Sequence, residues 1–218
     1  METGTQQRGS IEKSTPKPSN TCSGFTLIEL MVVVAIVAVI GVFAVPAFVS
    51  FIENNRIKTQ SSEFLSSLAL ARIEAVKRSI PVVVCPGTTS GCSGSAWEDG
   101  WVVFADTNAN GTPDSGETSL AVHGALAGSN ELRGNTPLAN RISFYPDGLV
   151  SELDNGDPGA FTLCLPADAS NRWDRSRIIL VSIIGRTRIA TSNTDGLPVD
   201  KCQSVSYTHL TLPTILLV

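Results

Sequence analysis

Arginine is concentrated near the C-terminal end of this 218-residue sequence. The segment from residue 172 to residue 188 holds one acid, Asp174, and five basic residues, which gives it a formal charge of +4. The five are Arg172, Arg175, Arg177, Arg186 and Arg188. Because the whole chain carries −4, the remaining residues carry −8. A concentrated positive patch on an acidic protein is typical of proteins that bind the phosphate backbone of nucleic acids.

Arg186 and Arg188 are the leading candidates within this patch. Side chains two residues apart in a strand point to the same face, so both guanidinium groups are expected to reach one DNA duplex. A solvated hairpin or a subunit interface explains the same charges. All three interpretations stay open at the level of sequence.

A second candidate site is a loop rich in oxygen-bearing side chains. Its possible ligands are Asp106, Asn108, Asn110, Asp114 and Glu117, with Gly111 at the turn. This spacing matches a calcium-binding EF-hand loop. The flanking residues, however, are typical of strands, and runs of Asn, Asp and Gly are common in hairpin loops. A plain turn without a cofactor is the preferred interpretation, and calcium is the alternative.

Cysteine usage indicates an exported domain. Setting aside Cys22 near the N-terminus, four cysteines remain, and an even count outside the membrane predicts two disulfides in an oxidising compartment. Three pairings are possible. We favour Cys85–Cys92, which closes a short loop, and Cys164–Cys202, which fixes the C-terminal segment. A zinc site is the alternative interpretation, but these cysteines do not form the paired Cys-x-x-Cys motifs that are typical of zinc sites.

The sequence offers little for an enzyme. Its two histidines are His123 and His209, and neither stands in a nucleophile motif. No Walker loop or dinucleotide fingerprint is present. We therefore expect a protein without catalytic residues.

The elements that must position these residues begin with an apolar segment. Residues 30–52 contain 23 consecutive positions without a charge. At about 1.5 Å per helical residue, they cover the roughly 30 Å hydrocarbon core of a bilayer. Beyond them, apolar residues recur at three- and four-residue steps as far as Ala75, which predicts one helix from about Thr26 to Ser79. Pro81 ends it.

Short β-rich runs separated by turn residues follow the helix. They are residues 82–85, 100–104, 141–145, 161–164 and 177–182. Residues 186–190 are expected to pair with the last of these runs. The predicted fold class is α+β, with a long N-terminal helix whose second half packs on antiparallel sheets.

The residues at the head of the apolar segment carry a family resemblance. Residues 24–30 read Gly-Phe-Thr-Leu-Ile-Glu-Leu, which resembles the class III signal of type IV pilins and type II secretion pseudopilins. The resemblance implies cleavage between Gly24 and Phe25 by a prepilin peptidase and N-methylation of Phe25. It also implies that Glu29 serves assembly by meeting the terminal amine of a neighbouring subunit. A carboxylate inside a membrane is costly unless it has a partner.

Three later segments are similar to the GspH/FimT branch of minor pilins and pseudopilins. They are residues 71–78, residues 100–104 and the Gly185-Arg186-Thr187-Arg188 motif. The resemblance covers residues 24–202, and the motif implies capture of double-stranded DNA by Arg186 and Arg188, with Arg172, Arg175 and Arg177 as possible additional contacts.

This resemblance implies a domain organisation and a location. The expected parts are a leader (1–24), a transmembrane half-helix (25–52), an amphipathic half-helix (53–80), a periplasmic β-rich domain (81–202) and a tail (203–218). The tail resembles a translated sequencing adapter and is expected to be non-native. The protein is expected in the bacterial inner membrane, crossing it once, with other pilins and the assembly platform as partners. Its expected function is that of a minor pilin of a type IV pilus, with DNA uptake as a further role and a type II secretion pseudopilin as the alternative.

Overall fold

The computed structural model describes residues 24–88, 91–92, 96–153, 159–166 and 175–191. The chain divides into two compact units, residues 1–46 and residues 47–218. Several predicted features lie outside the described residues: the leader before Gly24, Arg172, Cys202 and the tail from residue 203.

The helix α1, Leu27–Arg78, begins at a capped end. The Thr26 hydroxyl accepts a hydrogen bond from the backbone N–H of Glu29 at 3.2 Å. This is the N-cap position, at which threonine satisfies one of the N–H groups that have no partner within the helix. The motif that resembles a prepilin signal therefore also contains the start signal of the helix.

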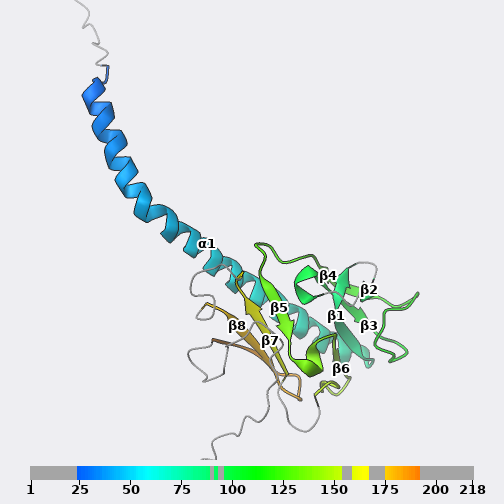
Figure 1. The fold of residues 1–218 in the computed structure, drawn as a ribbon. Helices are drawn as coiled ribbons and strands as arrows, with labels where there is room; N and C mark the ends of the chain where they lie inside the picture. The colour runs from blue at the N-terminus through cyan, green and yellow to red at the C-terminus, as the bar shows by residue number, and fades with distance from the viewer. Residues whose placement is uncertain (1–23, 89–90, 93–95, 154–158, 167–174, 192–218) are drawn as a thin grey trace, which may run out of the picture. The chain divides into compact units, whose positions relative to one another are not determined.

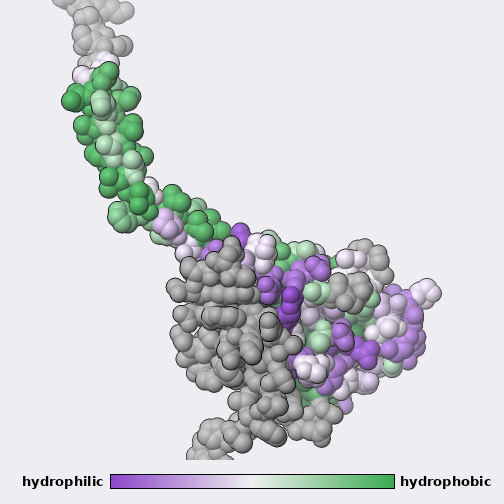
Figure 2. Space-filling model, in the orientation of Figure 1, coloured by the Kyte–Doolittle hydropathy of each residue, from purple (hydrophilic) through white to green (hydrophobic). Residues whose placement is uncertain are grey.

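The part of α1 in the first unit exposes apolar side chains on all sides. Phe25, Leu27, Ile28 and the valines and isoleucines that follow are more than half exposed, and Figure 2 shows this segment as a hydrophobic surface. Among the described residues, α1 is long and apolar enough to cross a membrane. A helix that is hydrophobic all round needs lipid or protein around it.

In the second unit, α1 is amphipathic. Its buried residues recur every three or four positions: Ile57, Gln60, Ser61, Phe64, Leu68, Ala71 and Ala75. The helix ends at Arg78, because Ser79 takes a positive φ of 57° and Pro81 follows. The predicted helix of residues 26–79 is confirmed to within one residue at each end.

Two antiparallel sheets pack with this half of the helix (Figure 1). The first sheet has the order β2-β1-β3-β4, and β6 pairs with β1 on the edge opposite β3. Its strands are β1 (Val82–Thr88), β2 (Gly91–Cys92), β3 (Trp101–Ala105), β4 (Ser119–His123) and β6 (Ile142–Phe144). The second sheet has the order β5-β7-β8-β9. Its strands are β5 (Glu131–Gly134), β7 (Gly159–Cys164), β8 (Arg177–Val181) and β9 (Thr187–Thr191).

One hydrophobic core joins the helix to both sheets. At its centre, the Phe64 ring of α1 makes edge-to-face contacts with Trp97, Trp101 and Phe161, with ring centroids 4.7–5.6 Å apart. Trp97 belongs to a short 3-10 helix, Trp97–Asp99, and a second one spans Thr136–Leu138. The α+β fold class predicted from the sequence is confirmed.

Candidate functional site

The β8–β9 hairpin places Arg186 and Arg188 on one face of the second sheet. Leu180 pairs with Arg188 in the register of the two strands, and Ile179 pairs with Ile189. Ile179 lies in the core that contains α1, whereas Leu180 packs on the opposite face of the sheet. Arg188 therefore lies on the sheet face that points away from the core. Arg186, two residues earlier, lies on the same side, and both residues are exposed.

The turn that precedes these arginines is held by hydrogen bonds. Gly185 N–H donates to the carbonyl of Ser182 at 2.8 Å, and Ser182 N–H donates to the carbonyl of Arg186 at 3.0 Å. The Ser182 hydroxyl also accepts the N–H of Arg186 at 3.2 Å. The backbone of Arg186 is thus held at both its N–H and its carbonyl, which fixes where its side chain leaves the chain.

Glycine is required at position 185 for two reasons. Its φ is +69°, a conformation that side-chain-bearing residues rarely adopt. A Cβ at this position would also lie 2.3 Å from the carbonyl oxygen of Gly148 and 2.9 Å from Nε of Arg72. The glycine of the Gly-Arg-x-Arg motif therefore lets the turn pack closely against a neighbouring loop and the helix.

Arg72 of α1 forms a hydrogen bond with this turn. Its guanidinium donates to the carbonyl of Ile184 at 2.9 Å. Arg72 lies within residues 71–78, one of the segments that carry the family resemblance. Nothing in its spacing indicates a contact with a hairpin 112 residues later.

Two other arginines of the basic segment point elsewhere. The Arg175 guanidinium donates to Asn54 Oδ1 at 2.7 Å, to the Ser50 carbonyl at 3.1 Å and to Glu53 Oε2 at 2.9 Å. It therefore ties the β-rich part of the second unit to α1. Arg177 donates to the backbone carbonyls of Arg175 and Ser176, and desolvation by burial lowers its pKa. Among the described arginines of the basic segment, Arg186 and Arg188 are therefore the exposed ones.

The processing and assembly residues lie in the first unit. Gly24 and Phe25 are both exposed, with nothing within 4 Å of a Cβ built at Gly24. Glu29 lies in the first turn of α1, where a carboxylate interacts favourably with the helix dipole. The assembly role of Glu29 stays a prediction.

The loop of residues 106–117 satisfies its carboxylates internally. Asp106 accepts the backbone N–H groups of Asn110 and Gly111. Asp114 accepts the side-chain amides of Asn108 and Asn110, each at 2.7 Å. These two hydrogen bonds lower the pKa of Asp114. These carboxylates accept hydrogen bonds from within the loop, and the preference for a plain turn over a calcium site stays a prediction.

The described cysteines of the second unit form disulfides. Cys85 and Cys92, the first of the two favoured pairs, are bonded across a separation of seven residues, with their Cα atoms 5.5 Å apart. Cys164 is also disulfide-bonded. Cys202, its predicted partner, lies outside the described residues, so that pairing stays a prediction.

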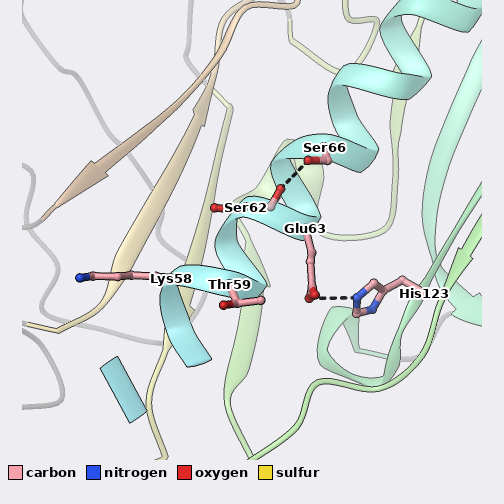
Figure 3. A pocket seen from close by; sticks show the side chains of 6 residues that line it. All are labelled: Lys58, Thr59, Ser62, Glu63, Ser66 and His123. Carbon is pink, nitrogen blue, oxygen red and sulfur yellow. Dashed lines mark hydrogen bonds and ion pairs between the residues drawn. The ribbon is translucent and has the colours of Figure 1, made fainter. Parts of the chain in front are cut away.

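A shallow polar pocket that the sequence does not predict lies between α1 and β4. His123 stacks face to face on Trp101, with ring centroids 3.9 Å apart. One ring nitrogen faces the Gly124 carbonyl at 2.7 Å, and the other faces the Glu63 carboxylate at 3.2 Å (Figure 3). Neither nitrogen faces a serine hydroxyl, although Ser62 and Ser66 line the pocket. The pocket thus has no Ser-His-acid arrangement.

These features define a class of protein. An apolar helix that begins with a Gly-Phe-Thr-Leu-Ile-Glu sequence and continues into an antiparallel β domain is the construction of a pilin-class subunit. Residues 19–45 match the model of the prokaryotic N-terminal methylation motif. Residues 60–185, more than half of the chain, match the model of the type II transport protein GspH.

The chain therefore belongs to the GspH family. Members of this class are structural subunits that assemble with other pilins and with pilus or secretion machinery, so the expectation of a non-enzyme is confirmed. The methylation motif and the apolar helix indicate a membrane-anchored chain with its C-terminal domain outside the bilayer.

The comparison with solved structures gives two crystal forms of one protein, the type IV minor pilin FimU of Pseudomonas aeruginosa. The first is 19% identical, covers 71% of this chain and 98% of the other, and has a TM-score of 0.49. The second is 18% identical, covers 67% and 98%, and has a TM-score of 0.45. No curated protein sequence matches the chain.

Proposed function

We propose that this chain is a minor subunit of a type IV pilus and that its β8–β9 hairpin binds double-stranded DNA during uptake. The observation that carries the proposal is the placement of Arg186 and Arg188 on one outward face, beside a turn whose backbone is fixed. Two guanidinium groups on one face can contact neighbouring phosphates without a rearrangement of the backbone.

The charge distribution supports the same proposal. Most of the acidic residues lie outside the basic segment, which keeps the chain at −4 overall. Within the basic segment, a duplex would therefore meet favourable charge at the exposed arginines of the hairpin. Few contacts imply weak binding, roughly 10⁻⁴ to 10⁻⁶ M, and the affinity is expected to be independent of base sequence because phosphates carry no sequence information. Several subunits on one filament would add avidity.

Processing and location complete the proposal. A prepilin peptidase cuts between Gly24 and Phe25 and methylates Phe25, and the mature chain resides in the bacterial inner membrane before assembly. The β-rich domain faces the periplasm. Glu29 then meets the terminal amine of a neighbouring subunit. In this proposal the loop of residues 106–117 is a plain turn.

The experiment that tests DNA binding compares the full chain in detergent micelles with its Arg186→Gln/Arg188→Gln variant. Glutamine keeps hydrogen-bonding capacity and removes two positive charges. The parent should retard a duplex in a native gel at low salt, and the variant should not. The Arg141→Gln variant is the control. Arg141 is also an exposed arginine, but it follows the second 3-10 helix and lies outside the β8–β9 hairpin.

A second candidate function is that of a pseudopilin in type II secretion. The match of residues 60–185 to a type II transport protein model favours it. In that case, neither the parent nor the double variant would retard the duplex, and deletion of the gene would block export of folded proteins instead of DNA uptake. Neighbouring pilus genes or a secretion operon would separate the two systems.

A further inference from the structure

Strand β4 forms an open edge of the first sheet. It pairs with β3 on one side, and among the described residues no strand pairs with its other side, which we call the β4 edge. Gly87 N–H donates to the Gly100 carbonyl, so every second residue from Gly100 onward, including Val102, points its backbone groups towards β1. Val122 lies opposite Val102 in the register of β3 and β4. The N–H and C=O of Val122 therefore point away from β3, to the β4 edge.

The β4 edge lacks the features that usually protect the edge of a sheet. Strand β4 contains no Lys, Arg, Asp, Glu or Pro. In contrast, β5 carries Glu131 and Arg133, β9 carries Arg188, and β2 and β6 have only two and three residues. Charged side chains and short length keep a sheet edge from pairing with another chain. The register shift between β3 and β4 lies between Ser119 and Ala121, so the rest of β4 pairs regularly.

On the side of the core, the β4 edge borders the shallow polar pocket between α1 and His123 (Figure 3). Ser62 and Ser66 contribute hydroxyl groups to this pocket, and its charges are one of each sign, Lys58 and Glu63. A strand added to the β4 edge would direct every second side chain to this side. Short polar side chains, such as threonine or serine, match a lining of this kind.

On the opposite face, the β4 edge borders an acidic cleft of about 280 Å³. Val102 and Phe104 of β3 give the cleft an apolar floor, and Ser119 of β4 also lines it. Its charged lining residues, Asp114 and Glu117, are both acids. A lysine or arginine on an added strand can lay its aliphatic part along the floor and bring its cation to these carboxylates.

We infer that the β4 edge binds an extended segment of another protein by strand addition, and that this segment alternates short polar residues with lysine or arginine. The backbone of the segment pairs with Val122, its short residues face α1, and its basic residues face the acidic cleft. Main-chain hydrogen bonds supply the affinity, and the alternation of side chains supplies the specificity. The inference does not depend on DNA binding by the β8–β9 hairpin.

A second copy of this chain fits the β4 edge less well. Its helix α1 exposes many apolar side chains, but the backbone groups of a helix are already paired and cannot extend a sheet. Its own β4 has no basic residue for the acidic cleft. Its β9 has one, Arg188, but the neighbouring Ile189 would bring an apolar side chain to the polar pocket.

Peptide binding to the full chain in detergent micelles tests the inference. The probe is a fluorescent peptide, Thr-Lys-Thr-Lys-Thr-Lys-Thr, whose threonines and lysines fall on opposite faces of a strand. The control peptide has the same sequence with methylated backbone nitrogens, which keeps the charge and removes the hydrogen-bond donors. Fluorescence anisotropy should show binding of the probe about tenfold tighter than that of the control. A peptide with glutamate in place of lysine should also bind about tenfold more weakly than the probe.

Two variants at Val122 locate the bound peptide. Val122→Pro removes the outward N–H and leaves the hydrogen bonds between β3 and β4 in place, at an edge position where sheets tolerate proline. Val122→Thr keeps the N–H and is the matched control. We expect Val122→Pro to weaken probe binding about tenfold and Val122→Thr to change it less than about twofold. The Arg186→Gln/Arg188→Gln variant should bind the probe as the parent does, which separates this test from that of DNA binding.

Unchanged fluorescence of the buried tryptophans checks that Val122→Pro folds. If it does not fold, the comparison of the probe with the methylated peptide on the parent decides. The inference is overturned if the parent does not bind the probe, binds the methylated or the glutamate peptide equally well, or loses no affinity in a folded Val122→Pro protein. Self-association of the parent that Val122→Pro abolishes, measured by light scattering, would also overturn it and assign the β4 edge to a second copy.

Discussion

Replacing Gly185 with alanine tests how the turn presents the two arginines. The structure gives two separate costs for this change, the positive φ of 69° and the approach of the new Cβ to the Gly148 carbonyl oxygen at 2.3 Å. A non-glycine residue in such a conformation costs about 1–3 kcal/mol. Relief of the close contact requires the two turns to separate, which breaks the hydrogen bond from Val150 to Ile183 and costs about 1 kcal/mol more.

Two other glycines allow these costs to be measured separately. A Cβ at Gly116 meets nothing within 4 Å, but its φ is +106°. Gly124 has neither a positive φ nor a neighbour within 4 Å of its Cβ. Alanine there should stabilise the protein slightly, by about 0.4–1 kcal/mol, because the unfolded chain loses freedom. The expected order of stability is Gly124→Ala above the parent, then Gly116→Ala, then Gly185→Ala, which should lose about 2–4 kcal/mol.

Urea unfolding of the full chain in detergent, followed by tryptophan fluorescence, measures this order. Trp97 and Trp101 are buried and lie in the core around Phe64, so their emission reports loss of the fold. Gly185→Ala should also weaken DNA binding in conditions where the protein remains folded. A Gly185→Ala protein as stable as Gly124→Ala would refute the account of why this turn contains glycine.

Three further predictions concern processing, assembly and the disulfide. Gly24→Ala should leave the unprocessed chain in the membrane, detected as an intact mass that still includes the leader; a normal mature mass would contradict the cleavage site. Glu29→Ala should leave membrane insertion and the β domain intact but reduce co-purification with filaments, since the carboxylate is expected to meet a neighbouring amine; undiminished incorporation would remove that role. Cys85→Ser/Cys92→Ser should destabilise the protein by about 2.5 kcal/mol, from the entropy of an eight-residue loop; urea unfolding with an unchanged midpoint would show that the bridge contributes little.

Much of the fold follows from local patterns. The apolar segment, the helical periodicity up to Ala75 and Pro81 define α1. The β-branched runs give β3 and β8 to within one residue at each end, whereas β1 extends three residues beyond the predicted run. Strand β5 was missed, because the run from Glu131 to Gly134 has little β propensity. It is a strand because Leu132 and Gly134 are buried when it pairs with β7.

The candidate site was predictable only in part. The motif and its two-residue spacing place Arg186 and Arg188 on one face, and the hairpin register agrees with that prediction. The contacts of Arg175 with α1 and of Arg72 with the turn join residues more than one hundred positions apart, and no local pattern encodes such contacts. The pairing of His123 with Glu63 is hidden for the same reason.

The salt dependence of DNA affinity tests the proposed function most directly. Each phosphate neutralised by a cation contributes about 0.9 to the slope of log affinity against log salt. If Arg186 and Arg188 each contact one phosphate, the parent should lose about twelvefold in affinity between 50 and 200 mM salt from these contacts. The Arg186→Gln/Arg188→Gln variant should show a slope smaller by about 1.8. Equal slopes and equal affinities for the parent and the variant would contradict the assignment of DNA binding to this hairpin.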